Sequence, residues 1–131
     1  MSKKLAIIAA NGGLDAAYKV LNIATAAAAM DTEVAIFFTF EGLKLIHKQA
    51  NAQLPLPASM EGMQEAFQVH NVPTVPELIE MAQEMGVKFI ACQMTMDLMG
   101  ITSADLVDGH EVGGAATFLA FATEADVSLT F

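Results

Sequence analysis

The sequence of 131 residues contains one cysteine, Cys92, and its surroundings make it the strongest candidate for chemistry. The apolar run VKFIA at 87–91 precedes it and is typical of a strand, whereas QMTMDLM at 93–99 is typical of a helix. This junction places Cys92 at the carboxyl end of a strand, where open α/β sheets bind ligands. It also lies beside a helix N-terminus, whose N–H groups favour a thiolate over a thiol. A buried, inert cysteine is the competing interpretation.

Methionines accompany the cysteine, since seven of the nine lie between Met60 and Met99. Cys92, Met96 and Met99 have the i, i+4, i+7 spacing of one helix face. Core packing is the favoured interpretation of methionines at this spacing. A Cu(I) site would use the same soft ligands, but no second cysteine supports it. An adaptable apolar rim, useful for docking a partner that presents its own sulfur, is the third alternative.

The three histidines, His47, His70 and His110, lack the mutual spacing of metal ligands. His110 follows Asp108 and Gly109 in a predicted turn, which we expect near the same carboxyl edge as Cys92. There it could serve as a proton donor or thiolate partner, although an ordinary surface histidine is the favoured interpretation. A Cys–His hydrolase is also conceivable, but no family signature in the sequence supports it.

The turn at Asn11, Gly12 and Gly13 could cradle a phosphate on its backbone N–H groups. It matches neither GxGxxG nor a Walker motif, so a tight strand-to-helix turn is favoured. The remaining polar candidates are expected to have structural roles. The aspartates are expected to be cap and turn residues rather than a metal cluster, and the serines lack the context of a nucleophile elbow. These are Asp97, Asp105, Asp108, Ser59 and Ser103.

Hydrophobic patterning predicts strands that alternate with helices along one domain, 1–131. The strands are expected at 4–10, 33–40, 87–91, 106–107 and 127–131, and the helices at 14–30, 43–50, 61–70, 74–85, 92–99 and 112–123. Thr74 and Glu77 predict a capping box for the fourth helix. The alternation indicates an α/β fold with a mostly parallel sheet covered on both faces. All four prolines lie in 51–76, an irregular segment typical of a lid or binding loop.

Composition excludes several classes of function. The net charge is −9, with six lysines and no arginine, so nucleic acids and anionic membrane surfaces are unsuitable partners. No run approaches the ~20 apolar residues of a membrane span. The hydrophobic fraction of 54% instead favours a subunit interface. A single cysteine fits a reducing compartment, and we expect the cytoplasm.

The segment VKFIACQMTMDLMGI at 87–101 resembles the signature of the DsrE/DsrF/DrsH-like sulfur-relay family. It is most similar to the branch with Cys-x-Met-Ser-Met-Asp-x-Met-Gly, and Thr95 replaces the serine while keeping its hydroxyl. The run FFTFEGL at 37–43 also resembles that branch.

The resemblance implies a three-layer α/β/α domain with a five-stranded parallel sheet, assembled as a homo- or hetero-oligomer. It further implies that Cys92 carries sulfane sulfur as a persulfide, without a metal or organic cofactor, and exchanges it with TusA-like and rhodanese-like carriers. The alternatives are a non-enzymatic oligomeric scaffold and a small-ligand or nucleotide-binding module, each with an inert cysteine.

Overall fold

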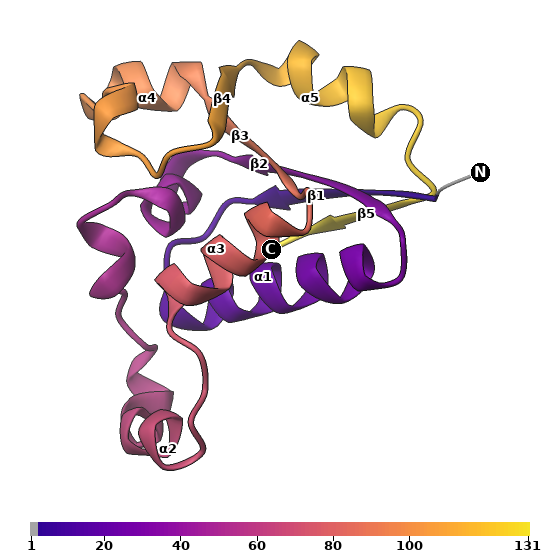
Figure 1. Ribbon diagram of the computed structural model, residues 1–131. Helices are drawn as coiled ribbons and strands as arrows, with labels where there is room; N and C mark the ends of the chain where they lie inside the picture. The colour runs from indigo at the N-terminus through magenta and orange to yellow at the C-terminus, as the bar shows by residue number, and fades with distance from the viewer. Residues whose placement is uncertain (1–2) are drawn as a thin grey trace.

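A five-stranded parallel sheet with the order β4-β3-β2-β1-β5 forms the centre of the computed structural model, which describes residues 3–131 (Figure 1). The strands are β1 (Lys4–Ala9), β2 (Glu33–Phe38), β3 (Lys88–Cys92), β4 (His110–Gly113) and β5 (Val127–Thr130). Because all the pairings are parallel, every strand ends at the same edge of the sheet. The predicted α/β class and the parallel sheet are confirmed.

Helices connect successive strands. The α-helices are α1 (Leu14–Ala29), α2 (Gln64–Val69), α3 (Val75–Glu84), α4 (Gln93–Met99) and α5 (Ala115–Ala122). Four short 3₁₀ helices complete the chain: η1 (Phe40–Ile46), η2 (Ala50–Ala52), η3 (Ala58–Met63) and η4 (Ser103–Asp105). α1 and α3 cover one face of the sheet and α5 covers the other, which makes three layers (Figure 1).

The alternation of side chains along each strand divides the core between these two faces. The larger cluster, which packs against α1 and α3, takes one set of strand residues: Leu5, Ile7, Ala9, Val34, Ile36, Phe38, Phe89 and Ala91. The smaller cluster, under α5, takes the intervening residues Ala6, Ala35, Phe37, Ile90 and Cys92. Strand parity alone therefore turns the Cys92 side chain toward α5.

Local signals set the ends of α3 and α4. The Thr74 hydroxyl accepts a hydrogen bond from the Glu77 N–H while the Glu77 carboxylate accepts one from the Thr74 N–H, so the predicted capping box is confirmed. Gly100 ends α4 in the left-handed region at φ 67°, where glycine carries no steric penalty.

The prediction of a fourth strand at 106–107 was wrong. Leu106 makes only an isolated antiparallel bridge with His47, and the strand beside β3 is His110–Gly113. The sequence HEVG has few of the apolar residues by which a strand is recognised, because β4 lies at the edge of the sheet. As a consequence, the following helix begins at Ala115 rather than at Val112.

The helix predicted at 43–50 forms two 3₁₀ segments, η1 and η2, instead. η1 packs directly on the end of β1: a side chain at Gly42 would collide with the Ala9 carbonyl oxygen, and the Thr39 N–H donates to that same oxygen at 3.0 Å. This close approach fixes the β2–η1 turn, which carries Thr39 and Phe40.

The proline-containing segment 51–76 does not cover Cys92. It packs against α1, because the Leu14 N–H donates to the Pro55 carbonyl at 2.8 Å and the Tyr18 hydroxyl donates to the Pro73 carbonyl at 2.7 Å. The expected lid therefore lies on the α1/α3 side of the molecule, with α2 at its far end (Figure 1).

Candidate functional site

Cys92 is the last residue of β3 and the N-cap of α4, which is the junction that the sequence predicts. Its backbone is extended, at φ −68° and ψ 114°, and it is paired with Gly113 of β4. The side chain contributes to the small core cluster with Phe37 and Phe118, whose rings stack with centroids 5.2 Å apart. One side of the thiol is therefore apolar.

Polar groups surround the other side of the sulfur. Burial by itself would raise the pKa of the Cys92 thiol, but four hydrogen-bond donors lower it below its ordinary value. They are the Thr95 hydroxyl, the Thr95 N–H, the Thr39 hydroxyl and the Met94 N–H. The Cys92 side chain forms no N-cap hydrogen bond, and these donors stabilise the thiolate relative to that of a cysteine buried among apolar side chains alone.

Thr95 is the organising residue of this polar side. It is fully buried, its hydroxyl oxygen accepts the Phe40 N–H at 3.0 Å, and it lies 3.4 Å from the Thr39 hydroxyl oxygen. Because the Phe40 N–H already occupies a lone pair, the Thr95 O–H proton is directed to another acceptor, and the sulfur is one. Thr39 and its role were not predicted, since a threonine inside the apolar run FFTF is also ordinary in a strand.

The backbone of Phe40 is unusual. Its φ of 49° is in the left-handed region, which residues other than glycine seldom occupy. This conformation presents the Phe40 N–H to Thr95, and the residue is 52% exposed. Such conformations cluster at functional sites.

The thiol is nearly covered, because Cys92 is only 5% exposed. The neighbouring elements α4, β4 and α5 carry large apolar side chains that are exposed to solvent. Together with Phe40 we call these the apolar rim: Phe40, Met94, Leu98, Met99, Val112 and Leu119. The third interpretation of the methionines, an adaptable rim, thus has Met94 and Met99 as members, whereas Met96 is buried.

Met96 packs in the larger core, as the favoured interpretation predicts, whereas Cys92 belongs to the smaller one. The two therefore do not share one helix face. The i, i+4 spacing fails here because Cys92 has extended rather than helical dihedral angles. Met99 is exposed.

His110 lies away from the thiol, and the expectation that it shares the carboxyl edge was wrong. It pairs with Phe89 at the start of the β3–β4 ladder, three residues before the Cys92–Gly113 pair, or about 10 Å along the strand. Its Nδ1 and Nε2 atoms hydrogen-bond the Val107 carbonyl at 2.7 Å and the Ser103 hydroxyl at 2.6 Å. The geometry therefore does not support a Cys–His pair.

The other histidines and the carboxylates have local structural roles. His47 Nδ1 accepts the Gln49 and Ala50 N–H groups, each at 3.2 Å, and His70 follows the last residue of α2. Asp105 accepts hydrogen bonds from the N–H and hydroxyl of Thr102, which lower the pKa of that carboxyl. Within residues 3–131, no group of three or more His, Cys, Asp or Glu side chains could hold a metal ion.

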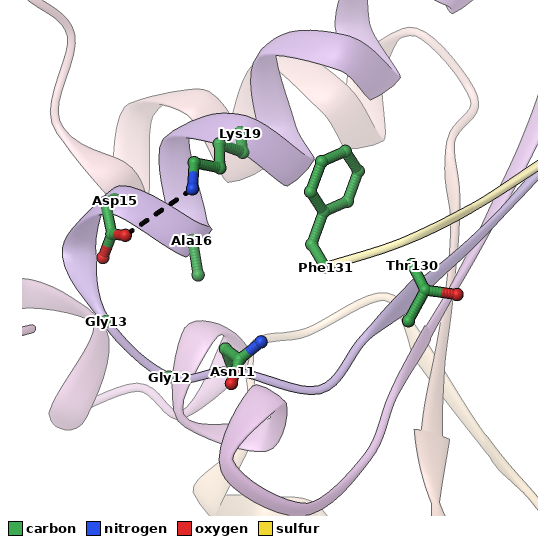
Figure 2. Close-up of a pocket in the computed structure, with 8 residues that line it drawn as sticks. All are labelled: Asn11, Gly12, Gly13, Asp15, Ala16, Lys19, Thr130 and Phe131. Carbon is green, nitrogen blue, oxygen red and sulfur yellow. Dashed lines mark ion pairs between the residues drawn. The ribbon is translucent and has the colours of Figure 1, made fainter.

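A cavity of about 550 Å³ opens beside Asn11, Gly12 and Gly13, where β1 and β5 end (Figure 2). The charges there do not favour a phosphate. Lys19 is paired with Asp15 at 3.8 Å, and the Asp15 carboxylate lies against Gly13 in the first turn of α1. An anion at this turn would meet that carboxylate, so the tight-turn interpretation is favoured over a nucleotide site.

No helix among the described residues is both long enough and apolar enough to cross a membrane.

Comparison with known proteins identifies the relatives of the chain. Residues 1–61 and 57–130 match the DsrE/DsrF/DrsH-like family. The sulfur carrier protein DsrE2 of Allochromatium vinosum is 40% identical over 154 aligned residues, which cover 97% of this chain and 97% of that protein. The uncharacterized protein YrkE of Bacillus subtilis is 36% identical over 154 aligned residues, covering 98% of this chain and 96% of YrkE.

Two solved structures share the fold. The ychN protein from E. coli superposes with a TM-score of 0.72 at 19% identity, with both chains covered completely. The protein of unknown function MTH1491 from Methanobacterium thermoautotrophicum gives a TM-score of 0.70 at 13% identity and covers 98% of this chain and 99% of its own. At these identities the likeness concerns the fold alone.

Proposed function

Because the chain belongs to the DsrE/DsrF/DrsH-like family, we propose that Cys92 carries sulfane sulfur as a persulfide and relays it between partner proteins. The observation that carries the proposal is the position of Cys92 at the carboxyl end of β3 and the N-cap of α4, where hydroxyl and N–H donors lower the pKa of its thiol. The relative named a sulfur carrier protein supports the same role.

The reaction is an exchange between sulfur atoms that needs no outside oxidant. The Cys92 thiolate attacks the terminal sulfur of a donor persulfide, a new S–S bond forms, and the donor's own S–S bond breaks, so that the donor departs as a thiolate. An acceptor thiolate then attacks the terminal sulfur on Cys92. The Cys92 thiolate is regenerated, and the acceptor becomes the persulfide.

The donors around Cys92 assist both halves of this exchange. Thr39 and Thr95 stabilise the thiolate that attacks and later departs, because a hydrogen bond to a charged sulfur favours the charged form. A lower thiol pKa also makes Cys92 a better leaving group when the acceptor attacks. No metal or organic cofactor enters either step.

The partners that fit this role are small carriers with their own reactive sulfur, of the TusA-like and rhodanese-like types, and a second copy of the chain. The apolar rim supports docking, because a partner that covers these exposed side chains removes their apolar surface from water. We place the relay, in one domain, in the reducing environment of the cytoplasm, where free thiols persist.

The test uses the single cysteine as its own reporter. Native protein treated with a polysulfide donor should gain the mass of one sulfur atom, and a thiol acceptor should remove it. Cys92→Ser should abolish the gain, and Met94→Ala, a rim variant that keeps the thiol, should retain it. Loading that persists in Cys92→Ser would refute the proposal.

A second role is favoured by the low exposure of the thiol: an oligomeric scaffold in which Cys92 is inert packing. In that case a thiol probe would react slowly with the native protein, as it does with a fully buried cysteine. It would react fast only after unfolding. Fast reaction of the native protein would exclude this alternative.

A further inference from the structure

A cavity of about 560 Å³, separate from the thiol, lies where α1, the η2 turn, α2 and the start of α3 meet. Its volume is within the range of about 300–1,000 Å³ that is typical of small-molecule sites. We call it the amide cavity, because four carboxamide side chains line it: Asn51, Gln53, Gln64 and Gln68.

Asn51 is the residue that points to a ligand. It is only 4% exposed, and within residues 3–131 its side chain makes no hydrogen bond, although its backbone N–H donates to the His47 carbonyl at 2.9 Å. No fully buried side-chain atom of the described residues lacks a partner, so the Asn51 amide must still be reachable from the cavity that it lines. A ligand that enters the cavity can therefore hydrogen-bond the Asn51 amide, which offers both donors and an acceptor.

The walls of the cavity also restrict the ligand. Tyr18 and Phe67 stack on one another with centroids 5.1 Å apart and an angle of 14° between the rings, and together they form an aromatic side of the cavity. The Tyr18 hydroxyl donates to the Pro73 carbonyl, which fixes this side in place. A planar, apolar ring fits against such a surface.

The charges around the cavity exclude anions. Every described lining residue is uncharged, and none offers a cation to a phosphate or carboxylate. A negative charge does lie beside the cavity: the Glu77 carboxylate accepts hydrogen bonds from the Thr74 N–H and hydroxyl and, after burial, is the second cause of the raised pKa of Tyr18. Carboxamides, in contrast, offer both donors and acceptors to a neutral polar group.

We propose that the amide cavity binds a neutral, planar heterocycle that carries a carboxamide or lactam edge, which Asn51 recognises. The cavity lies against the larger core through Leu14, Leu54 and Val75, whereas Cys92 belongs to the smaller core across the sheet. The ligand therefore binds whether or not Cys92 is present, and this site stands apart from the sulfur relay.

The experiment uses nicotinamide as the probe and nicotinate as its anionic counterpart. The two molecules share one ring and differ only in that nicotinamide carries a carboxamide where nicotinate carries a carboxylate. In a titration followed by NMR, nicotinamide should shift the Asn51 side-chain amide and the ring signals of Tyr18 and Phe67, with an affinity that is roughly millimolar or tighter for so small a molecule. Nicotinate should bind at least about tenfold more weakly.

Two variants and one control localise the effect. Asn51→Leu keeps the volume and removes the amide, and Ala52→Trp fills the cavity; each should weaken nicotinamide binding about tenfold or more. Gln49→Leu removes an exposed amide of the same turn and should leave binding unchanged. Absence of saturable shifts in the native protein, shifts centred on other residues, or equal binding of nicotinate would each overturn the assignment. Cys92→Ser should bind nicotinamide normally, which separates this test from the fate of the relay.

Discussion

The two faces of the sheet are packed very differently. On one face, α1 and α3 bury a large cluster that includes Ile7, Ile36 and Phe38. On the other face, α5 alone covers a small cluster, and the helix itself stays largely exposed although its sequence AATFLAFA is almost entirely apolar. The thiol belongs to the thinly covered face.

The two faces therefore have different roles: one stabilises the fold and the other holds the thiol. The thick face holds most of the buried apolar surface, which is the main source of folding free energy. The thin face needs to hold only Cys92, its polar donors and one helix. A partner that displaces or joins α5 could reach the sulfur without disturbing the larger core. Substitutions on the two faces test this division.

Phe38→Ala on the thick face should lower the free energy of unfolding by about 3–5 kcal/mol. Phe38 is fully buried and packs edge-on against Phe89, so the deletion leaves a cavity that the surrounding strands cannot close. Urea denaturation measures the change. A loss below about 1 kcal/mol would show that this face does not carry the stability of the fold.

Phe118→Ala on the thin face should cost less, about 3 kcal/mol, at the low end of the range for a buried phenylalanine, because α5 can settle onto the sheet. Its larger consequence concerns the thiol. Phe118 shares the small cluster with Cys92, so its removal should speed the reaction of the native protein with a thiol probe. Phe38→Ala, studied under conditions where it remains folded, provides the comparison. If both variants accelerate labelling equally, the faces are not separate.

Thr95→Val should raise the pKa of the Cys92 thiol. The variant loses the hydroxyl that stabilises the thiolate, so the pH profile of alkylation should move to higher pH and the rate at neutral pH should fall. Thr95→Ser keeps the hydroxyl and should restore the native profile.

Thr25→Val is the matched control for that substitution, because the Thr25 hydroxyl donates to the Leu21 carbonyl on the opposite side of the sheet. It should leave the alkylation profile unchanged. If Thr95→Val and Thr25→Val both react as the native protein does, the hydroxyl at 95 has no part in activating the thiol.

Leu119→Glu should change stability least, by no more than about 0.5 kcal/mol, because the residue is exposed on α5. It should nevertheless weaken the proposed self-association, since it places a charge in the apolar rim of an already acidic chain. Sedimentation velocity of the native protein and the variant measures the effect. Val69→Glu, at an exposed apolar position on α2, is the control and should sediment as the native protein does.

Much of the fold follows from the sequence, because apolar runs and capping residues act locally. The strand before Cys92 and the Thr74–Glu77 capping box are both recognisable from neighbouring residues. β4 is not, because the sequence HEVG becomes a strand only through its pairing with Phe89–Cys92. The 3₁₀ segments after β2 similarly depend on the contact between Gly42 and the end of β1.

The candidate site was predictable in part for the same reason. The position of Cys92 between a strand and a helix follows from its neighbours, but the role of Thr39 requires two strands to end side by side. The expectation for His110 failed because a position along β4 could not be assigned before the register was known. Burial of the sulfur under α5 is likewise a property of the packed sheet.

The proposed relay requires the folded chain to hold Cys92 as a reachable, stabilised thiolate, and the pH profile of its alkylation reports on both properties. The rate of iodoacetamide modification of the native protein should rise with a midpoint below the value of about 8.5 that is typical of a free cysteine. The unfolded chain should show the ordinary midpoint. A native protein that reacts only after unfolding, or with a midpoint at or above the ordinary value, would contradict the account.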